Sequence, residues 1–159
     1  MHTIEDSTVV DVPIRTAYNQ WTQFEDFPEF MEGVKEVRQL DDKRLAWRAE
    51  IMGKEVSWTA EITEQVPDQR IAWRSTSGPP QVGAVAFTPV APDKTRIQLR
   101  IEFEPEGAAE KTASALGAVK ARVSGDLKRF QEFIERRGVS TGQWRGEIRG
   151  GQVREKPAR

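Results

Sequence analysis

Apolar and polar residues alternate with a period of two through the middle of this chain, from residue 34 to residue 104. The alternation is sharpest near the end of this stretch, where Ile97, Leu99 and Ile101 share one face and charged or amide residues share the other. Such a pattern is typical of strands with one buried and one solvated face, and it favours an antiparallel sheet over a parallel one. The predicted strands lie near residues 34–40, 44–51, 54–66, 69–76, 81–89 and 94–104.

The segments between these strands are short and rich in turn-forming residues, as in Asp41-Asp42-Lys43 and Ser77-Gly78-Pro79-Pro80. Short connections join antiparallel neighbours, so we expect the strands to follow one another in a meander. The longest strands, of roughly 11 to 13 residues, exceed what a flat sheet in a small domain needs. We therefore expect the sheet to bend around another element.

A long helical pattern follows the strands and supplies that element. Apolar residues recur every three or four positions between residues 108 and 137, which predicts one helix. These apolar residues are Leu116, Val119, Val123, Leu127, Phe130 and Ile134. Arg136-Arg137-Gly138 is a typical helix end, because cations favour the negative end of the helix dipole and glycine adopts the terminating conformation. Gly117 weakens the helical pattern. The sequence therefore also allows a break near Gly117, with the stable helix beginning only there.

The N-terminal part of the chain predicts a strand near residues 4–12 and a helix near residues 13–23. The strand should lead directly into the helix, because Pro13 fits a first helical turn better than a strand interior. Three phenylalanines and a methionine lie within residues 24–31. Solvating so much apolar surface is costly, so we expect this short segment to fold back onto the core.

Composition limits the chemistry that the chain can perform. Its 159 residues fit one domain, and the absence of cysteine excludes disulfides, thiolate nucleophiles and cysteine metal sites. The only histidine, His2, lies close to the terminus, so the sequence predicts neither a histidine base nor a histidine metal site. A phosphate-binding glycine loop is not recognisable either. We therefore predict no metal and no cofactor.

The sequence shows neither a secretory signal nor an apolar run of the roughly 20 residues that a membrane span needs. The net charge of −1 does not point to a charged partner. These features predict a cytoplasmic protein without a membrane span, as a monomer or a small homo-oligomer.

The regular patterns end at Gly138, which divides the chain into a predicted domain of residues 1–138 and a basic, flexible tail of residues 139–159. From Gly138 onward, five cations and two carboxylates give 5 − 2 = +3, which leaves −1 − 3 = −4 for the remainder. Five dispersed cations are few for a nucleic-acid site, so nucleic acid is not an expected partner. Trp144 is the one residue that hints at docking of the tail.

The runs VVDVPIRTAYNQWTQFEDFPEFMEGVKEV and DLKRFQEFIERRG resemble, in the same order, segments of bacterial polyketide cyclase/dehydrase-type proteins. The pieces RLAWRAEIMGKEVSWTAEITEQVPDQRIAWRS and GAVAFTPV between them do so too. These proteins belong to the START-like, birch-pollen-allergen-like (SRPBCC) superfamily, together with the coenzyme-Q-binding family. The resemblance covers about residues 4–138.

The resemblance implies the helix-grip fold, an α+β fold. In it a curved antiparallel sheet of about seven strands wraps around a long C-terminal helix, and two short helices follow the first strand. Members of the superfamily carry lipids, bind quinones or shape polyketides, so the fold does not decide the function.

A helix-grip fold normally leaves room between sheet and helix, and the apolar strand faces would line it. Trp47, Trp58 and Trp73 lie on neighbouring predicted strands and are expected to form an aromatic wall whose indole N–H groups can orient a carbonyl. Each of them can also simply fill the core. The predicted lining consists of Trp47, Trp58, Trp73, Phe87, Leu99, Ile101, Phe103, Leu116, Val123 and Leu127.

Candidate catalytic groups are few. Tyr18, the sole tyrosine, is the one candidate, although a helix residue at this spacing is more often packed in the core. Arg48 and Arg74 are expected to point outward, unless a bulge in the sheet turns one of them inward, where it could bind a carboxylate or an enolate. Carboxylates such as Glu55 and Glu61 fall on the solvated strand face.

Three functions remain open. The first is reversible binding or carriage of a small hydrophobic molecule, such as a lipid, a quinone, an isoprenoid or a polyketide-like compound. The second is a cyclase or dehydratase that acts on a polyketide-like substrate in the same cavity. The third is a protein that contacts a macromolecule and has a collapsed pocket, as some coenzyme-Q-binding relatives resemble ribosome-associated proteins. We favour the first, since an apolar wall is visible in the sequence and acid–base groups are scarce.

Overall fold

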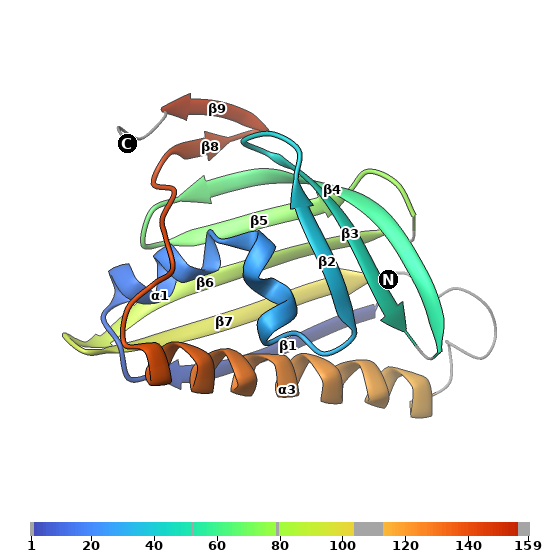
Figure 1. The fold of residues 1–159 in the computed structure, drawn as a ribbon, viewed down its shortest axis with the longest axis horizontal. Coiled ribbons are helices and arrows are strands. Elements are labelled where there is room, and N and C mark those ends of the chain that lie inside the picture. Colours follow the sequence, from blue (N-terminus) through green and yellow to red (C-terminus); the bar gives the residue numbers. More distant parts are fainter. Residues whose placement is uncertain (1, 52, 79, 104–112, 156–159) are drawn as a thin grey trace.

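The structure, a computed structural model, describes residues 2–51, 53–78, 80–103 and 113–155. An antiparallel sheet curves around one long helix, and two short helices follow the first strand (Figure 1). The elements are β1 (His2–Val10), α1 (Ile14–Trp21), the 3-10 helix η1 (Phe24–Glu29), β2 (Val34–Gln39), β3 (Arg44–Ile51), β4 (Lys54–Val66), β5 (Arg70–Ser75), β6 (Gln81–Ala91), β7 (Lys94–Phe103), α3 (Ala113–Arg137), β8 (Glu147–Arg149) and β9 (Gln152–Glu155).

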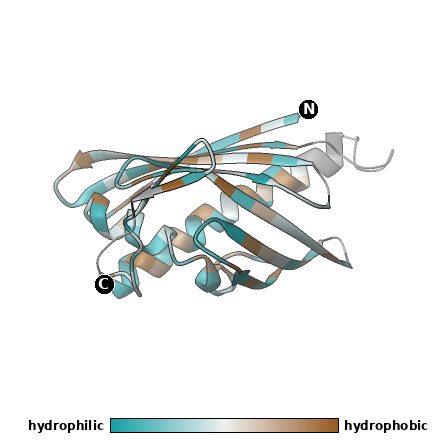
Figure 2. Ribbon diagram, turned by 90° about the horizontal axis from the view of Figure 1, so that it is seen from above, coloured by the Kyte–Doolittle hydropathy of each residue, from teal (hydrophilic) through white to brown (hydrophobic). Residues whose placement is uncertain are grey.

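The main path of the sheet has the order β1-β7-β6-β5-β4-β3-β2, and neighbouring strands are antiparallel. The predicted meander is confirmed from β2 to β7, and β1 joins it by pairing with β7. Hydrophobic and hydrophilic bands alternate along the strands, as the period of two requires (Figure 2). The predicted α+β, helix-grip arrangement is thereby confirmed.

α3 lies beside β1 at one end of this path and is bonded to the segment before β2 at the other. On the β1 side, the Ser124 hydroxyl donates to the Asp6 carboxylate. On the side of β2, the Asp126 carboxylate accepts the backbone N–H of Glu32 at 3.0 Å and pairs with Arg129. Burial raises the pKa of Asp126 above its ordinary value, although the Arg129 guanidinium opposes this shift. The sheet therefore grips the helix from two sides.

The described part of α3 is continuous through Gly117 and Gly125, so the break that we considered near Gly117 does not occur. The predicted residues 108–112 of this helix lie outside the described residues. Gly138 ends the helix with a φ of 72° and donates its N–H to the Ile134 carbonyl at 2.8 Å, as the sequence predicted.

An aromatic cluster fills one half of the interior. The Trp21 ring centroid lies 5.8 Å from that of Phe27 in η1, 6.3 Å from that of Phe87 in β6, and 4.8 Å from that of Phe130 in α3. All three phenylalanines of residues 24–30 are buried, so the predicted folding back of this segment is confirmed. Edge-to-face ring contacts of this kind add to the free energy of apolar burial.

The prediction of a flexible tail is wrong for residues 139–153, which we call the C-terminal strap. Ile148 of β8 is fully buried and stands opposite Gln65 of β4, while β9 pairs with β8. Trp144 is 8% exposed, and its backbone N–H donates to the Thr22 hydroxyl at 3.1 Å. The strap is thus part of the folded domain.

Polar side chains of α1 explain why the strap docks despite its charge. The Gln20 side-chain oxygen accepts the backbone N–H of Thr141 at 2.8 Å, and its amide nitrogen donates to the Thr141 hydroxyl at 3.2 Å. The Asn19 amide donates to Gln143 at 3.3 Å. Gln20 and Asn19 are buried, so the strap satisfies groups that would otherwise destabilise the helix.

Replacing Phe130 by alanine is expected to lower the free energy of unfolding by about 3 to 5 kcal/mol, because a large cavity would open in the aromatic cluster. Phe133→Ala on the same helix is a matched control, since that ring is only half-buried; its cost should stay near about 1 to 2 kcal/mol. Urea unfolding followed by tryptophan fluorescence measures both. Equal losses would contradict the central position of Phe130.

Candidate functional site

The inward-facing residues of the sheet differ in burial between the two ends of the fold. Towards α1, residues such as Ile71, Val85 and Ile97 are fully buried. Towards the end where β7 stops and α3 begins, several inward-facing apolar side chains are only half-buried. This half-buried apolar set consists of Trp47 (β3), Val56 and Trp58 (β4), Trp73 (β5), Ile101 and Phe103 (β7) and Val119 (α3).

Trp73 lies flat across the neighbouring strand because that strand has no side chain beneath it. Gly83 of β6 is the register partner of Trp73, and a Cβ atom on Gly83 would lie 2.2 Å from Cζ2 of the indole. On its other side Gly83 pairs with Ile101. Glycine in a strand interior marks such a close approach. The wall between β5 and β7 is therefore formed by the Trp73 ring.

Trp47 and Trp58 form a second aromatic surface. They are cross-strand partners, and their rings stack with centroids 5.6 Å apart and planes inclined by 9°. The Trp47 ring also lies 5.6 Å from Phe27, which connects this stack to the aromatic cluster. Nε1 of Trp47 is buried and has no hydrogen-bond partner among the described residues. Leaving a buried donor without a hydrogen bond costs free energy, so an acceptor placed near this nitrogen would be stabilising.

The predicted lining residues fall into two groups in the structure. Five of them, Trp47, Trp58, Trp73, Ile101 and Phe103, belong to the half-buried apolar set. Four others are buried in the closed core: Phe87, Leu99, Val123 and Leu127. The side chain of Leu116 lies outside the described part of the structure. The structure thus brings together the residues towards one end of the predicted site.

The predicted catalytic candidate lies elsewhere. Tyr18 is fully buried at the α1 end, with its ring 5.4 Å from Phe87. Burial raises the pKa of the Tyr18 phenol above its ordinary value, and the nearby Gln65 amide and Arg145 guanidinium only partly oppose this. The phenol therefore keeps its proton at neutral pH and does not serve as a base there.

A buried polar cluster surrounds Tyr18, and sequence reasoning missed most of it. Arg145 of the strap pairs with Asp68 at 2.8 Å, donates to the Asn19 side-chain oxygen at 2.6 Å, and places its guanidinium carbon 5.4 Å from the Tyr18 ring centroid. Gln65 faces this cluster because the β4–β5 register shifts between Ile62 and Glu64, as expected of a bulge. The only sequence signal for the cluster was Trp144, next to Arg145.

The bulges of the sheet do not turn the candidate arginines inward. The Arg48 side chain is 45% exposed and pairs with Glu36 and Glu55, and the Arg74 side chain is 56% exposed and pairs with Glu61. The expected outward direction of both arginines is confirmed. A role for either one inside the fold therefore finds no support in the structure.

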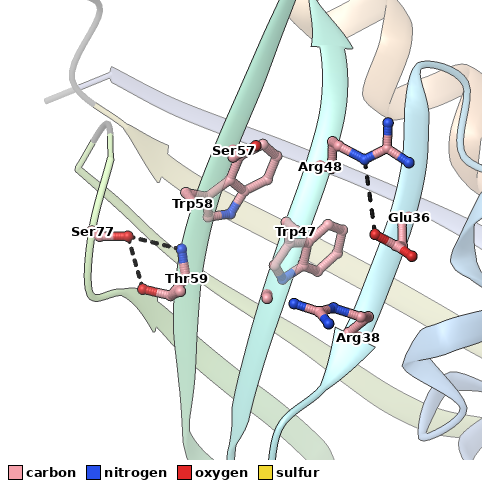
Figure 3. A pocket seen from close by; sticks show the side chains of 9 residues that line it. Glu36, Arg38, Trp47, Arg48, Ser57, Trp58, Thr59 and Ser77 are labelled. Atoms are coloured by element: carbon pink, nitrogen blue, oxygen red, sulfur yellow. Dashed lines mark hydrogen bonds and ion pairs between the residues drawn. The ribbon is translucent and has the colours of Figure 1, made fainter.

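A hollow of about 300 Å³ lies on the opposite, solvated face of β2, β3 and β4 (Figure 3). Trp47 and Trp58 border it, but their strand phase places their rings on the inner face. Its other lining residues are mostly polar: Glu36, Arg38, Ala46, Arg48, Ser57, Thr59 and Ser77. Ser77 and Thr59 are joined by their hydroxyls at 2.8 Å. This polar hollow is not the predicted cavity between sheet and helix.

Two further observations concern the described residues as a whole. They contain no group of three His, Asp or Glu side chains that could hold a metal ion. They also contain no helix that is long and apolar enough to cross a membrane.

Residues 10–132 match the model of a family described as polyketide cyclase / dehydrase and lipid transport. This chain belongs to that family. The match includes the two short helices, β2 to β7 and most of α3, and it ends before the C-terminal strap. The family relationship that the sequence suggested is thereby confirmed.

Individual relatives agree with this assignment. The chain is 46% identical over 149 residues to an uncharacterized 17.2 kDa protein of Streptomyces lincolnensis, covering 93% of this chain and 99% of that protein. A START superfamily protein from Mycobacterium smegmatis superposes with a TM-score of 0.67 at 17% identity, over 86% of this chain and 97% of the other. The Zhui aromatase/cyclase of a Streptomyces species superposes with a TM-score of 0.73 at 16% identity, over 89% and 98%. At such identities the two structures support the fold alone.

Replacing Gly83 by alanine is expected to lower the free energy of unfolding by about 1 to 3 kcal/mol, because the new methyl group would displace the Trp73 indole. In a Trp73→Ala background the same change should cost far less. Gly117→Ala is the control, because a Cβ there meets no atom within 4 Å; it should stabilise the exposed helix by up to about 1 kcal/mol. Urea unfolding of the wild-type protein, Gly83→Ala, Trp73→Ala and the double variant measures this double-mutant cycle. Additive losses of the free energy of unfolding would show that Trp73 does not lie on Gly83.

Proposed function

We propose that this protein reversibly binds a small hydrophobic molecule between the sheet and the first half of α3. The observation that carries the proposal is the half-buried apolar set, in which seven inward-facing side chains from four strands and α3 keep part of their surface in contact with solvent. A bound apolar molecule would remove this surface from water. Burying about 40 Å² of apolar surface on one such side chain contributes about 1 kcal/mol.

The shape of the set favours a ligand with a flat or extended apolar body. The Trp73 ring lies along the sheet over Gly83, and the Trp47–Trp58 stack offers a second aromatic surface. The buried Nε1 of Trp47 supports an acceptor on the ligand, such as a carbonyl or hydroxyl oxygen, since this donor has no partner among the described residues. An apolar body with few polar atoms is the usual complement of a pocket of this kind.

The polar side chains beside Phe103 favour binding and offer one candidate for chemistry. They include Gln81 and His2, the two register partners of Phe103, and Ser75, whose hydroxyl accepts the Gln81 backbone N–H at 2.9 Å. Gln81 and Ser75 are neither acids nor bases near neutral pH, so they can orient a ligand but not exchange protons with it. The His2 ring, whose centroid lies 6.1 Å from that of Phe103, belongs to a residue type that can act as a base. A cyclase role would have to rest on His2 and on the shaping of a reactive substrate, and the family description names polyketide cyclase beside lipid transport.

A macromolecular function with a collapsed pocket is less consistent with the burial pattern. Trp47 and Trp58 do pack on each other, which fills part of the interior. Trp73, Ile101 and Phe103 nevertheless remain half-buried, whereas a collapsed interior would bury them.

Substituting Ile101 by aspartate is expected to weaken ligand binding at least tenfold, because an inward charge would have to be desolvated by an apolar ligand. Gln98→Asp on the same strand is the matched control, since its side chain points to solvent and is exposed. Titration with a naphthalene-sulfonate dye and with long-chain fatty acids, followed by fluorescence, measures both affinities. Circular dichroism confirms that each variant is folded.

Native mass spectrometry of the freshly purified protein tests the proposal without assuming a ligand. A co-purifying apolar molecule that is lost in the Ile101→Asp variant would support it. A protein that stays empty, and that binds neither the dye, fatty acids, quinones nor aromatic polyketides, would overturn it. Conversion of an added polyketide-like compound into a cyclised product would favour the cyclase alternative.

A further inference from the structure

Four buried polar atoms at the closed end of the fold make no hydrogen bond of acceptable geometry among the described residues, although the Gln65 amide lies near enough to the Tyr18 hydroxyl to lower the pKa of the phenol. They are the Tyr18 hydroxyl oxygen, both amide atoms of Gln65, and Oδ1 of Asp68. Tyr18 and Gln65 are at most 1% exposed, and Arg145 contacts Tyr18 on one side and Asp68 on the other. The four atoms therefore belong to one enclosed region, between α1, the end of β4 and the strap.

So many unsatisfied atoms in one place require a physical explanation. A buried donor or acceptor without a partner costs about 1 to 3 kcal/mol, and native proteins keep few such groups. Gln65 is the clearest case, because the bulge turns its side-chain amide into the interior. An apolar side chain at this position would leave no polar atom without a partner. An amide at this position is favourable only if a partner accepts a hydrogen bond from its nitrogen and another hydrogen bond is donated to its oxygen.

The donors and acceptors present are complementary to water. The protonated Tyr18 phenol and the Gln65 nitrogen can donate, while the Gln65 oxygen and the Asp68 carboxylate oxygen can accept. A buried water molecule typically makes about three hydrogen bonds to groups of this kind. Larger molecules are disfavoured, because each of the four atoms is itself buried.

We propose that Tyr18, Gln65 and Asp68 enclose a site for one or two tightly bound water molecules, which join the C-terminal strap to the rest of the fold. The Arg145–Asp68 ion pair closes the site from the strap, and the Asn19 side chain holds Arg145 in place. The site is independent of the half-buried apolar set, so its test does not depend on any apolar ligand.

Substituting Gln65 by methionine distinguishes a hydrated site from a dry one by the sign of its effect. If water is bound, the apolar side chain leaves the water and its other partners short of hydrogen bonds, and the melting temperature should fall by roughly 3 to 8 °C. If the region is dry, the substitution removes two unsatisfied atoms and the melting temperature should stay equal or rise. Gln98→Met on the exposed face is the matched control and should change little.

Tyr18→Phe and the double variant Tyr18→Phe/Gln65→Met complete a cycle. Shared water predicts that the double variant loses less than the sum of the two single losses, because one water network is removed once. A crystal structure of the wild-type protein provides the direct measurement. Ordered water within hydrogen-bond distance of at least two of the four atoms supports the proposal. A dry region, together with neutral or stabilising single variants, would overturn it.

Discussion

The curvature of the sheet depends on α3, which is bonded to both ends of the strand order. β1 and β2 stand at opposite ends of that order. α3 reaches β1 through the Ser124–Asp6 bond and reaches the residues before β2 through Asp126 and Glu32. These bonds are polar and lie on the flanks of the helix, so its apolar stripe remains available for the concave face of the sheet.

The aromatic cluster then determines which half of the interior is closed. α1 and η1 insert Trp21 and Phe27 between the sheet and the second half of α3, where Phe130 meets them. No described helix supplies such a layer for the first half of α3. Inward-facing residues there, such as Trp73, keep part of their surface exposed. The proposed binding site is therefore a consequence of where the two short helices lie along the sheet.

Sequence patterns predicted the elements of this fold well and the polar contacts between them poorly. Alternation with a period of two reports which strand face is buried, and this was enough to place Trp73 and Ile101 on the inner face. A bulge adds one residue and reverses the phase beyond it, so nothing in the local pattern showed that Gln65 faces inward. The degree of burial of the tryptophans was equally invisible, because it depends on which elements are packed above them.

The strap was missed for a related reason, and it shows how the two ends of the fold differ. Its charges suggested solvation, but its partners are polar side chains of α1, far away in the sequence, with Gln20 and Thr22 accepting its backbone N–H groups. The closed end is thus held by polar contacts that satisfy one another, while the other end keeps apolar surface that a ligand can cover. Phe87 belongs to the closed end, since its ring contacts both Tyr18 and Trp21. Because the two ends share so few residues, changes that loosen the strap need not alter the affinity for an apolar ligand.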